Sequence, residues 1–184
     1  MILPIYAYGS KILKKKAAEV EQDFPELAEL IANMWETMYN ANGVGLAAPQ
    51  IGQSIRLFLV DTSQLDDDED NDEKGIKQVF INAEKLEESG EAWLYEEGCL
   101  SIPKIRGDVS RPPTLRLRYL NEKFEMCETT FEGVNARVIQ HEYDHIEGKL
   151  FTEQLKPVRR RLVKRRLENI KKGAVDVDYP MRFR

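Results

Sequence analysis

The sequence predicts an α+β fold in which antiparallel β-sheets pack around a central helix with the sequence His-Glu-x-x-His, a candidate metal-binding helix. Strand-like runs in the middle of the chain follow one another without intervening helices, which favours antiparallel sheets. Apolar residues also recur at helical spacing in the N-terminal half and near the C-terminus, so a helix is expected in each place. A chain of 184 residues can bury a substantial core, and we expect a single domain over residues 1–184.

The first helix is expected over residues 25–40, "PELAELIANMWETMYN". Pro25 suits a first-turn position, apolar residues recur at spacings of three and four, and Gly43 marks the end of the pattern. Four strand-like runs follow, at residues 54–61, 77–87, 91–98 and 114–133. The last run alternates apolar and polar residues on both sides of residues 121–123, which predicts a hairpin.

Charge is distributed unevenly along the chain. The net charge is -5, yet residues 156–172 contain nine Lys or Arg and one Glu, which leaves 18 basic and 31 acidic residues elsewhere. A helix is expected over residues 153–172, with five apolar residues covering the body of the protein: Leu155, Leu162, Val163, Leu167 and Ile170. Its outward cationic face suits either solubility or docking to RNA phosphates, and both interpretations stay open.

The acidic run, the apolar segments and the cysteines limit the class of protein to which the chain can belong. Residues 66–73, "DDDEDNDE", predict a solvated, mobile loop, because Asn71 and Lys77 depart from the pattern of a calcium loop. The apolar residues at the start precede the basic ones, the reverse of a secretory signal, and no run approaches the roughly 18 apolar residues of a membrane span. We therefore expect a cytoplasmic protein in which Cys99 and Cys127 remain thiols.

The sequence "HEYDH" at residues 141–145 is the strongest chemical signal. His141 and His145 lie on one stripe of a helix expected over residues 133–148, and residues four apart on a helix are separated by about 5–6 Å, so both imidazoles can bind one cation. Glu142 can reach a metal-bound water without binding the ion, as a general base must. Because the chain has no other histidine, this pattern favours a metal site over a helix whose histidines satisfy core hydrogen bonds.

The spacing of residues does not fix a third metal ligand. Phe151 occupies the position at which some zinc proteases supply a third histidine, and it cannot bind a metal. Glu168 is spaced as in a thermolysin-like peptidase but lies in the cationic segment, whereas Asp144 points away from the histidine stripe. Cys99, in "EEGCLSIP", follows the end of an expected strand, and a thiolate with two imidazoles leaves one position open for water. Cys99 and Glu168 stay alternatives, as does a purely apolar role for Cys99.

A second segment, "GVGLAAPQIG" at residues 43–52, formally contains a dinucleotide-binding fingerprint. That fingerprint requires a preceding strand and a following helix, whereas here a helix precedes and a strand follows, so we reject it. Small residues instead permit the close approach of another backbone, such as a peptide substrate. The Gln50 amide is suited to donate to a developing oxyanion, although it could also lie in a solvated turn.

Taken together, "GVGLAAPQIG", "EGCLSIP" and "QHEYDH" resemble three signature segments of the peptide deformylase family, in the same order. With the flanking helices and strands, the resemblance covers essentially the whole chain. It implies one catalytic domain of the bacterial type, a metallohydrolase that removes the N-formyl group from the formylmethionine of nascent polypeptides and releases formate. It also implies one divalent metal ion, Fe²⁺, for which Zn²⁺, Ni²⁺ or Co²⁺ can substitute, and it supports ribosome docking through residues 156–172.

The resemblance assigns roles by position. It implies three metal ligands, Cys99, His141 and His145, and an acid–base role for Glu142. It implies that Gln50 and the backbone N–H of Leu100 donate to the oxyanion, and that the backbone of Gly45 lines the substrate cleft.

The resemblance further implies that Glu97 and Arg106 form an ion pair that braces the cysteine turn. Two features depart from the family pattern: the acidic insertion at 66–73, and Arg137 in the wall of the side-chain pocket. Two other functions are alternative hypotheses, namely a zinc endopeptidase that uses Glu168 and an RNA-binding protein with a structural metal.

Overall fold

The computed structural model describes residues 1–65 and 74–183, so the acidic run at 66–73 lies outside the described residues. The described part contains three α-helices: α1 (Leu27–Asn40), α2 (Gly133–Ile146) and α3 (Pro157–Lys171). It contains nine strands: β1 (Ile5–Tyr6), β2 (Gly45–Ala47), β3 (Leu57–Asp61), β4 (Lys77–Ser89), β5 (Trp93–Cys99), β6 (Ile102–Arg111), β7 (Thr114–Leu120), β8 (Met126–Glu132) and β9 (Met181–Arg182). Four 3₁₀ helices complete it: η1 (Lys11–Lys14), η2 (Ala48–Ile51), η3 (Ser63–Leu65) and η4 (Phe151–Gln154).

The strands form three separate sheets. The largest has the order β2-β3-β4-β7-β8 and is antiparallel throughout, and β5 and β6 form an antiparallel hairpin beside it. The third sheet joins β1 to β9 in parallel and so ties the two ends of the chain together. The α+β class with antiparallel sheets is therefore confirmed, with β1–β9 as the parallel exception. The hairpin predicted over 114–133 is confirmed as β7 and β8.

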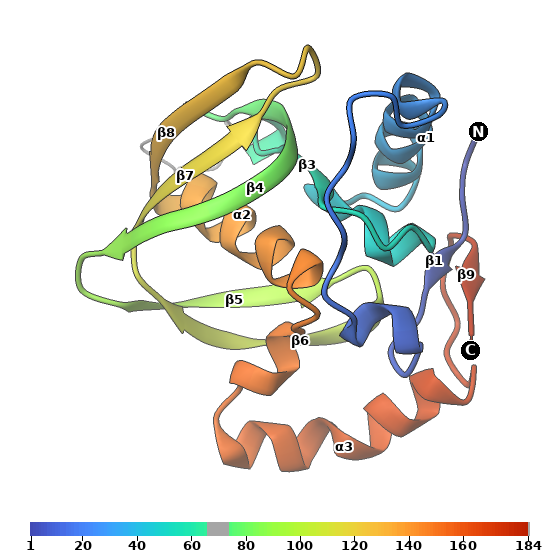
Figure 1. Cartoon of the computed structure of the whole chain (residues 1–184). Coiled ribbons are helices and arrows are strands. Elements are labelled where there is room, and N and C mark those ends of the chain that lie inside the picture. Colours follow the sequence, from blue (N-terminus) through green and yellow to red (C-terminus); the bar gives the residue numbers. More distant parts are fainter. Residues whose placement is uncertain (66–73, 184) are drawn as a thin grey trace.

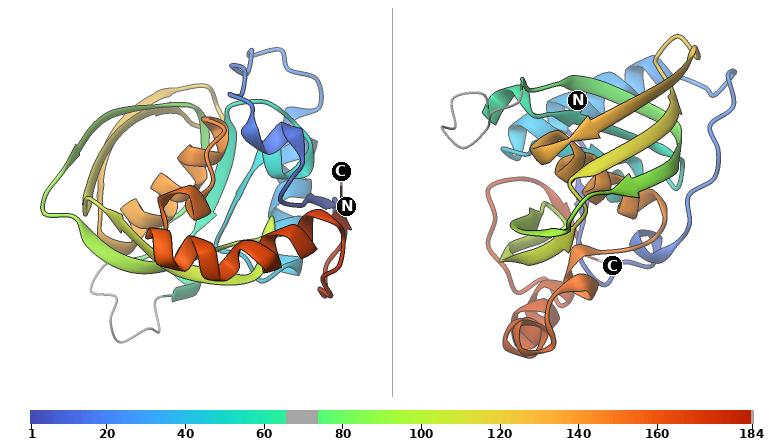
Figure 2. Two further views of the ribbon diagram at one scale, coloured as in Figure 1. Left: turned by 90° about the horizontal axis from the view of Figure 1, so that it is seen from below. Right: turned by 90° about the vertical axis from the view of Figure 1, so that its left-hand side faces the viewer.

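Helix α2 lies between the five-stranded sheet and the β5–β6 hairpin (Figure 1), and both further views agree (Figure 2). Strand β3 is apolar at nearly every position because both of its faces are covered. Leu57 and Leu59 pack with α1 in one apolar cluster, whereas Phe58 and Val60 pack with α2 in another. A third cluster lies between the β5–β6 hairpin, the N-terminal segment and α3. These clusters fix α2 relative to the strand ends that face it.

Several elements differ from those expected. Helix α1 begins at Leu27 rather than at Pro25, because Glu26 adopts a left-handed conformation with φ 56° that separates Pro25 from the helix. Strand β3 begins at Leu57 rather than at residue 54. No strand was predicted over 102–111, since Pro103 and Gly107 weaken its pattern, yet Pro103 is tolerated as the second residue of β6.

The helix expected over 153–172 is shorter in the structure, where α3 spans Pro157–Lys171. The chain at Leu155 and Lys156 is extended, because a residue before proline avoids the helical conformation, so the helix begins at Pro157. Val163, Leu167 and Ile170 are buried as predicted, and Leu155 is buried just before the helix. Leu162 is 67% exposed, since a step of one residue rotates its side chain by about 100° away from the buried stripe at Val163.

The cysteines and the helix lengths were also subjects of prediction. Cys99 and Cys127 are both free thiols, as predicted. Within residues 1–65 and 74–183, no helix combines the length and apolar character that a membrane span requires.

Candidate metal centre and active site

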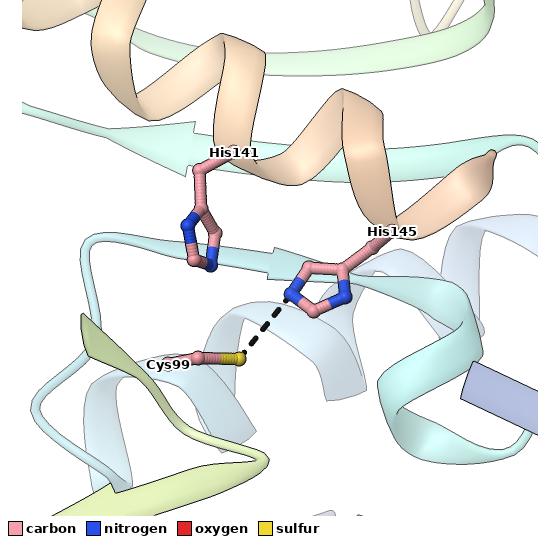
Figure 3. Close-up of side chains that lie close together, drawn as sticks. All are labelled: Cys99, His141 and His145. Atoms are coloured by element: carbon pink, nitrogen blue, oxygen red, sulfur yellow. Dashed lines mark hydrogen bonds between the residues drawn. The ribbon is translucent and has the colours of Figure 1, made fainter. Parts of the chain in front are cut away.

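The described part of the chain contains one group of side chains able to hold a metal ion, formed by Cys99, His141 and His145. The two histidines project from successive turns of α2, and Cys99 stands at the end of β5, where a register shift after Gly98 turns the strand (Figure 3). The Cys99 Sγ lies 3.3 Å from His145 Nε2, and the three ligand atoms all lie within 4.8 Å of one another. A thiolate and two imidazoles therefore converge on one point, a donor set that suits Zn²⁺ or Fe²⁺.

The alternative third ligands lie elsewhere. Asp144 accepts a hydrogen bond from Arg111 Nη1 at 2.8 Å, so its carboxylate is engaged on another side of α2. Glu168 is exposed on α3 and lines a separate pocket between that helix and η1. Phe151 is buried, with its ring centroid 5.9 Å from that of His141, so it packs against the histidine at the position where a third ligand would stand in some zinc proteases.

The protonation of the two histidines differs because their surroundings differ. Burial holds the pKa of His145 well below its usual range, so its imidazole is neutral and can bind a cation. Burial also opposes protonation of His141, but its interactions with Cys99 and Glu97 outweigh burial and raise its pKa. A histidine that binds a metal must be neutral, so metal binding releases the extra proton that a raised pKa keeps on His141.

Glu142 lies in the same cavity as Cys99 and His141. Its side chain is buried, and its Oε2 has no hydrogen-bond partner in the described part of the chain. Burial raises the pKa of Glu142 to about 7. This carboxyl group is therefore suited both to accept and to donate a proton near neutral pH.

Gly45 in β2 leaves the space that the Glu142 side chain occupies. A Cβ atom at residue 45 would lie 2.5 Å from Glu142 Oε1, closer than real Cβ contacts occur. Gly45 also lines the cavity, so the position predicted for the substrate cleft has a second role in admitting the carboxylate.

Gln50 lies in η2, directly after β2, and is 1% exposed, so the interpretation of a solvated turn is wrong. Its Oε1 accepts a hydrogen bond from the Ala47 N–H at 2.9 Å, which fixes the orientation of the amide. The Nε2 consequently faces the cysteine turn, at 3.2 Å from Ser101 Oγ and 3.4 Å from Cys99 Sγ. The Leu100 backbone lies in this same turn between β5 and β6.

The cavity beside these groups has a volume of about 530 Å³. Its walls come from β2, the β5–β6 hairpin and α2, and also from residues 177–179 near the C-terminus. No pattern in the sequence indicated that the C-terminal segment reaches this cavity. Its size and mixed polar and apolar walls suit one small ligand or the end of a peptide.

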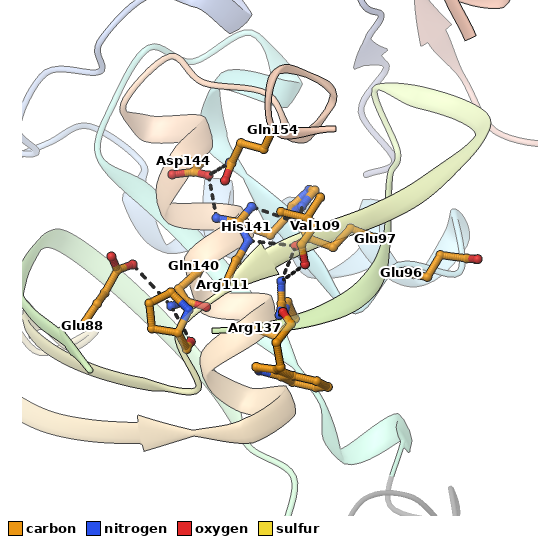
Figure 4. A network of polar contacts seen from close by, with 12 residues as sticks. Glu88, Glu96, Glu97, Val109, Arg111, Arg137, Gln140, His141, Asp144 and Gln154 are labelled. Atoms are coloured by element: carbon orange, nitrogen blue, oxygen red, sulfur yellow. Dashed lines mark hydrogen bonds and ion pairs between the residues drawn. The ribbon is translucent and has the colours of Figure 1, made fainter. Parts of the chain in front are cut away.

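Glu97 lies at the centre of a buried network of charged groups that includes His141 (Figure 4). It accepts two hydrogen bonds from Arg111, at 2.8 and 3.0 Å, and one from Arg137 at 3.0 Å. Its Oε1 lies 2.8 Å from His141 Nδ1, which leaves the other ring nitrogen of His141 for a metal. Burial opposes ionisation of Glu97, but hydrogen bonds from His141 and Arg111 hold its pKa well below the usual range.

The predicted ion pair between Glu97 and Arg106 is wrong. Arg106 pairs with Glu96 at 2.6 Å on the exposed face of the hairpin. Side chains alternate between the two faces of a strand, so Arg111, five residues beyond Arg106, points inward on the same side as Glu97. The alternation of buried and exposed residues along β6 could have identified Arg111, had this strand been recognised.

Arg137, the residue that departs from the family pattern in the wall of the side-chain pocket, is buried. It is 2% exposed, donates to the Trp93 and Val109 carbonyls at 2.8 Å, and stacks on the Trp93 ring at 4.9 Å. Burial lowers the pKa of Arg137, while Glu97 acts in the opposite direction. Its guanidinium group is therefore engaged by Glu97 and backbone oxygens, while Arg137 and Tyr95 both line the cavity.

Replacing Glu97 by Gln should lower metal affinity by about 10–100-fold and destabilise the protein by roughly 3–5 kcal/mol. The substitution removes the carboxylate that orients His141 and leaves the charges of Arg111 and Arg137 undercompensated. Metal titration and chemical denaturation measure the two effects. Glu96→Gln is the matched control, because its exposed pair with Arg106 is worth only about 0–1 kcal/mol; equal effects of both substitutions would contradict the prediction.

Comparison with known proteins adds an independent line of evidence on the family of this chain. Residues 2–161 match the family model described as polypeptide deformylase. The chain is 53% identical over 189 residues to the peptide deformylase of Christiangramia forsetii, covering 100% of this chain and 96% of the relative. It is 51% identical over 189 residues to that of Flavobacterium johnsoniae, with the same coverage.

Solved structures agree with this result. A crystal structure of a peptide deformylase from Legionella pneumophila superposes with a TM-score of 0.81 and 37% identity, covering 95% of this chain and 98% of that one. A peptide deformylase from Plasmodium falciparum gives a TM-score of 0.83 at 30% identity, covering 92% and 95%. The family model spans most of the chain, and the relative from Christiangramia forsetii is more than half identical over 96% of its length, so the chain belongs to the peptide deformylase family.

Proposed function

We propose that Cys99, His141 and His145 hold one divalent ion, and that α2 is the central metal-binding helix of a single catalytic domain. The convergence of the three ligand atoms, beside the buried carboxylate of Glu142, supports this assignment. The reaction is that of the family, in which the N-formyl group of formylmethionine on a nascent polypeptide is removed and formate is released.

In the proposed mechanism the residues of the chain move one proton and stabilise one charge. An ion held by Cys99, His141 and His145 would supply Lewis acidity that lowers the pKa of a nearby water molecule. Glu142 accepts the proton of this water and then passes it to the departing amine, roles for which a carboxyl group with a pKa of about 7 is suited.

Two donors serve the oxygen of the formyl group as it becomes negative. These are Gln50 Nε2, held by the bond of its Oε1 to Ala47, and the backbone N–H of Leu100. Glu97 keeps the His141 ring in one orientation through Nδ1. The backbone of Gly45 lines the substrate side of the cavity while leaving room for Glu142.

The proposed physiological ion is Fe²⁺, with Zn²⁺, Ni²⁺ or Co²⁺ able to replace it, since a donor set of one thiolate and two imidazoles suits several of these metals. An enzyme that acts on nascent peptides works where translation takes place, so we assign it to the cytoplasm. The central test is formate release from formyl-Met-Ala-Ser under anaerobic conditions, with protein loaded with Fe²⁺. Activity that disappears with a chelator and returns with Fe²⁺ supports the proposal, whereas metal-loaded protein that releases no formate refutes it.

We further propose that the outward face of α3 binds ribosomal RNA near emerging peptides. Arg161, Lys164 and Arg165 are exposed on this face, while Val163 and Leu167 attach the helix to the core. Glu168 is the one acidic residue of α3, so the cations of this helix outnumber it, and such an excess of positive charge favours the phosphate backbone of RNA.

Replacing Arg161, Lys164 and Arg165 by Gln should weaken co-sedimentation with ribosomes and reduce its dependence on salt, because fewer phosphate contacts form. Pelleting at rising salt concentration measures this, and the substitutions leave the buried stripe of α3 intact. The same change at three cations of the β7–β8 hairpin, Arg116, Arg118 and Lys123, serves as the control. Equal pelleting of the wild type and the α3 variant would contradict docking.

A further inference from the structure

The C-terminal segment returns from α3 to the wall of the active-site cavity. Gly173, with φ 76°, ends α3 and reverses the chain, and β9 then pairs in parallel with β1, as Figure 1 shows beside the label of the C-terminus. The Pro180 carbonyl accepts a hydrogen bond from the Ile5 N–H at 2.9 Å. Residues 177–179 are therefore held from both sides, by the end of α3 and by β9.

Tyr179 connects this segment to the cysteine turn. Its Oη donates a hydrogen bond to the Leu100 carbonyl at 2.8 Å, and its ring packs against the same apolar cluster as the Leu100 side chain. Burial, together with the charge of Cys99, raises the pKa of Tyr179 to about 12. The hydroxyl thus keeps its proton at neutral pH and remains a donor.

The turn that Tyr179 contacts connects Cys99 and Ile102, which pair across the β5–β6 hairpin. Residues 100 and 101 lie between β5 and β6 and belong to neither strand. The Ser101 carbonyl accepts from the Tyr8 N–H at 2.8 Å, and the Ser101 hydroxyl accepts from Gln50. The carbonyl of Leu100, the residue before Ser101, accepts its hydrogen bond from the Tyr179 hydroxyl. The Leu100 N–H belongs to the peptide unit before Leu100, which follows the strand residue Cys99, and the Leu100 carbonyl belongs to the unit after it. With the first unit attached to β5 and the second held by Tyr179, rotation about Leu100 is restricted, and so is the direction of its N–H.

We propose that Tyr179 is a positioning residue that aims the Leu100 N–H at the oxyanion, and that residues 177–179 form a further wall of the substrate cleft. This inference rests on the proposed function of Leu100. The family model ends at residue 161, so this contribution comes from a part of the chain beyond that match. An oxyanion donor acts on the charge that develops in the transition state, so misdirecting it lowers kcat more than it changes KM.

Tyr179→Phe tests the proposal, because it removes the hydroxyl and keeps the packed ring. With formyl-Met-Ala-Ser and Fe²⁺-loaded protein, we expect kcat to fall about three- to tenfold, the effect of losing one positioning hydrogen bond, and KM to change less than twofold. Metal content and Tm should stay at the wild-type values. In an amide NMR spectrum, the Leu100 N–H signal should shift relative to wild type.

The matched control is Tyr119→Phe, which removes a hydroxyl that accepts a hydrogen bond from Gln78 at 3.1 Å in the core. It should leave kcat unchanged, because Tyr119 does not line the cavity. Wild-type kcat in Tyr179→Phe would overturn the inference, as would a loss of activity that follows a loss of bound metal. Failure of the proposed function is distinguishable, since the wild-type protein itself would then release no formate.

Discussion

Replacing Glu142 by Gln should lower kcat for formate release by about 10²–10⁴-fold, the usual contribution of a general acid–base group. The amide keeps the size of the side chain and fits the space left by Gly45, but it cannot accept a proton from water. Steady-state kinetics with formyl-Met-Ala-Ser under anaerobic conditions measures the change. Because Glu142 is not one of the convergent metal ligands, bound metal should remain at the wild-type stoichiometry.

Glu147→Gln provides a matched control for this substitution. Glu147 follows the last turn of α2, and its carboxylate pairs with Arg56 at 2.6 Å, outside the cavity. Its replacement makes the same Glu-to-Gln change at the C-terminal end of the same helix and should change kcat less than twofold. If Glu142→Gln kept wild-type activity, another group would have to act as the base. The hypothesis of an RNA-binding protein with a structural metal instead predicts that neither the wild type nor Glu142→Gln releases formate.

Replacing Cys99 by Ala should abolish stoichiometric metal binding and, with it, formate release. The substitution removes one of three ligands, so we expect a loss of affinity greater than the roughly 100-fold that follows removal of a group that only orients a ligand. Metal analysis after gel filtration and the formate assay measure the two losses. Reconstitution at high metal concentration should restore little activity, because the coordination position itself is lost.

Two controls separate the roles of the candidate ligands. Cys127→Ala removes the other thiol of the chain, which lies in β8 and does not join the metal group. Glu168→Ala removes the ligand that the endopeptidase hypothesis requires, from an exposed site on α3. Both variants should bind metal and release formate like the wild type. Metal binding that survives in Cys99→Ala and fails in Glu168→Ala would overturn the assignment.

Local periodicity explains why much of the fold could be predicted. The helix of His141 and His145 follows from apolar residues at helical spacing, and the β7–β8 hairpin follows from alternation around a polar turn. Those signals act over a few residues and need no knowledge of distant contacts. The same reasoning missed β6 and misplaced two helix starts, where a left-handed Glu26 and the proline at residue 157 moved the boundary.

The arginine that pairs with Glu97 illustrates the limit of prediction from short sequence patterns. Arg106 and Arg111 both follow Cys99 closely in the sequence, and they are distinguished by the alternation along β6, a strand that was not predicted. The register and alternation of the β5–β6 hairpin turn Arg106 toward solvent and Arg111 inward, where Asp144 of α2 also meets it. Choosing between the two arginines therefore required the pairing of two strands and their packing on a helix.

The sequence by itself determined the α+β class, the helix with His141, Glu142 and His145, and the order of the motifs, because each depends on residues that are neighbours in the chain. The tertiary structure decided which distant groups join them. It brings Cys99 to within 3.3 Å of His145 and keeps Glu168 on another surface. It also brings Tyr179 to Leu100 across 79 residues of sequence. Long-range contacts of this kind arise from how helices and sheets pack, which no short spacing in the sequence encodes.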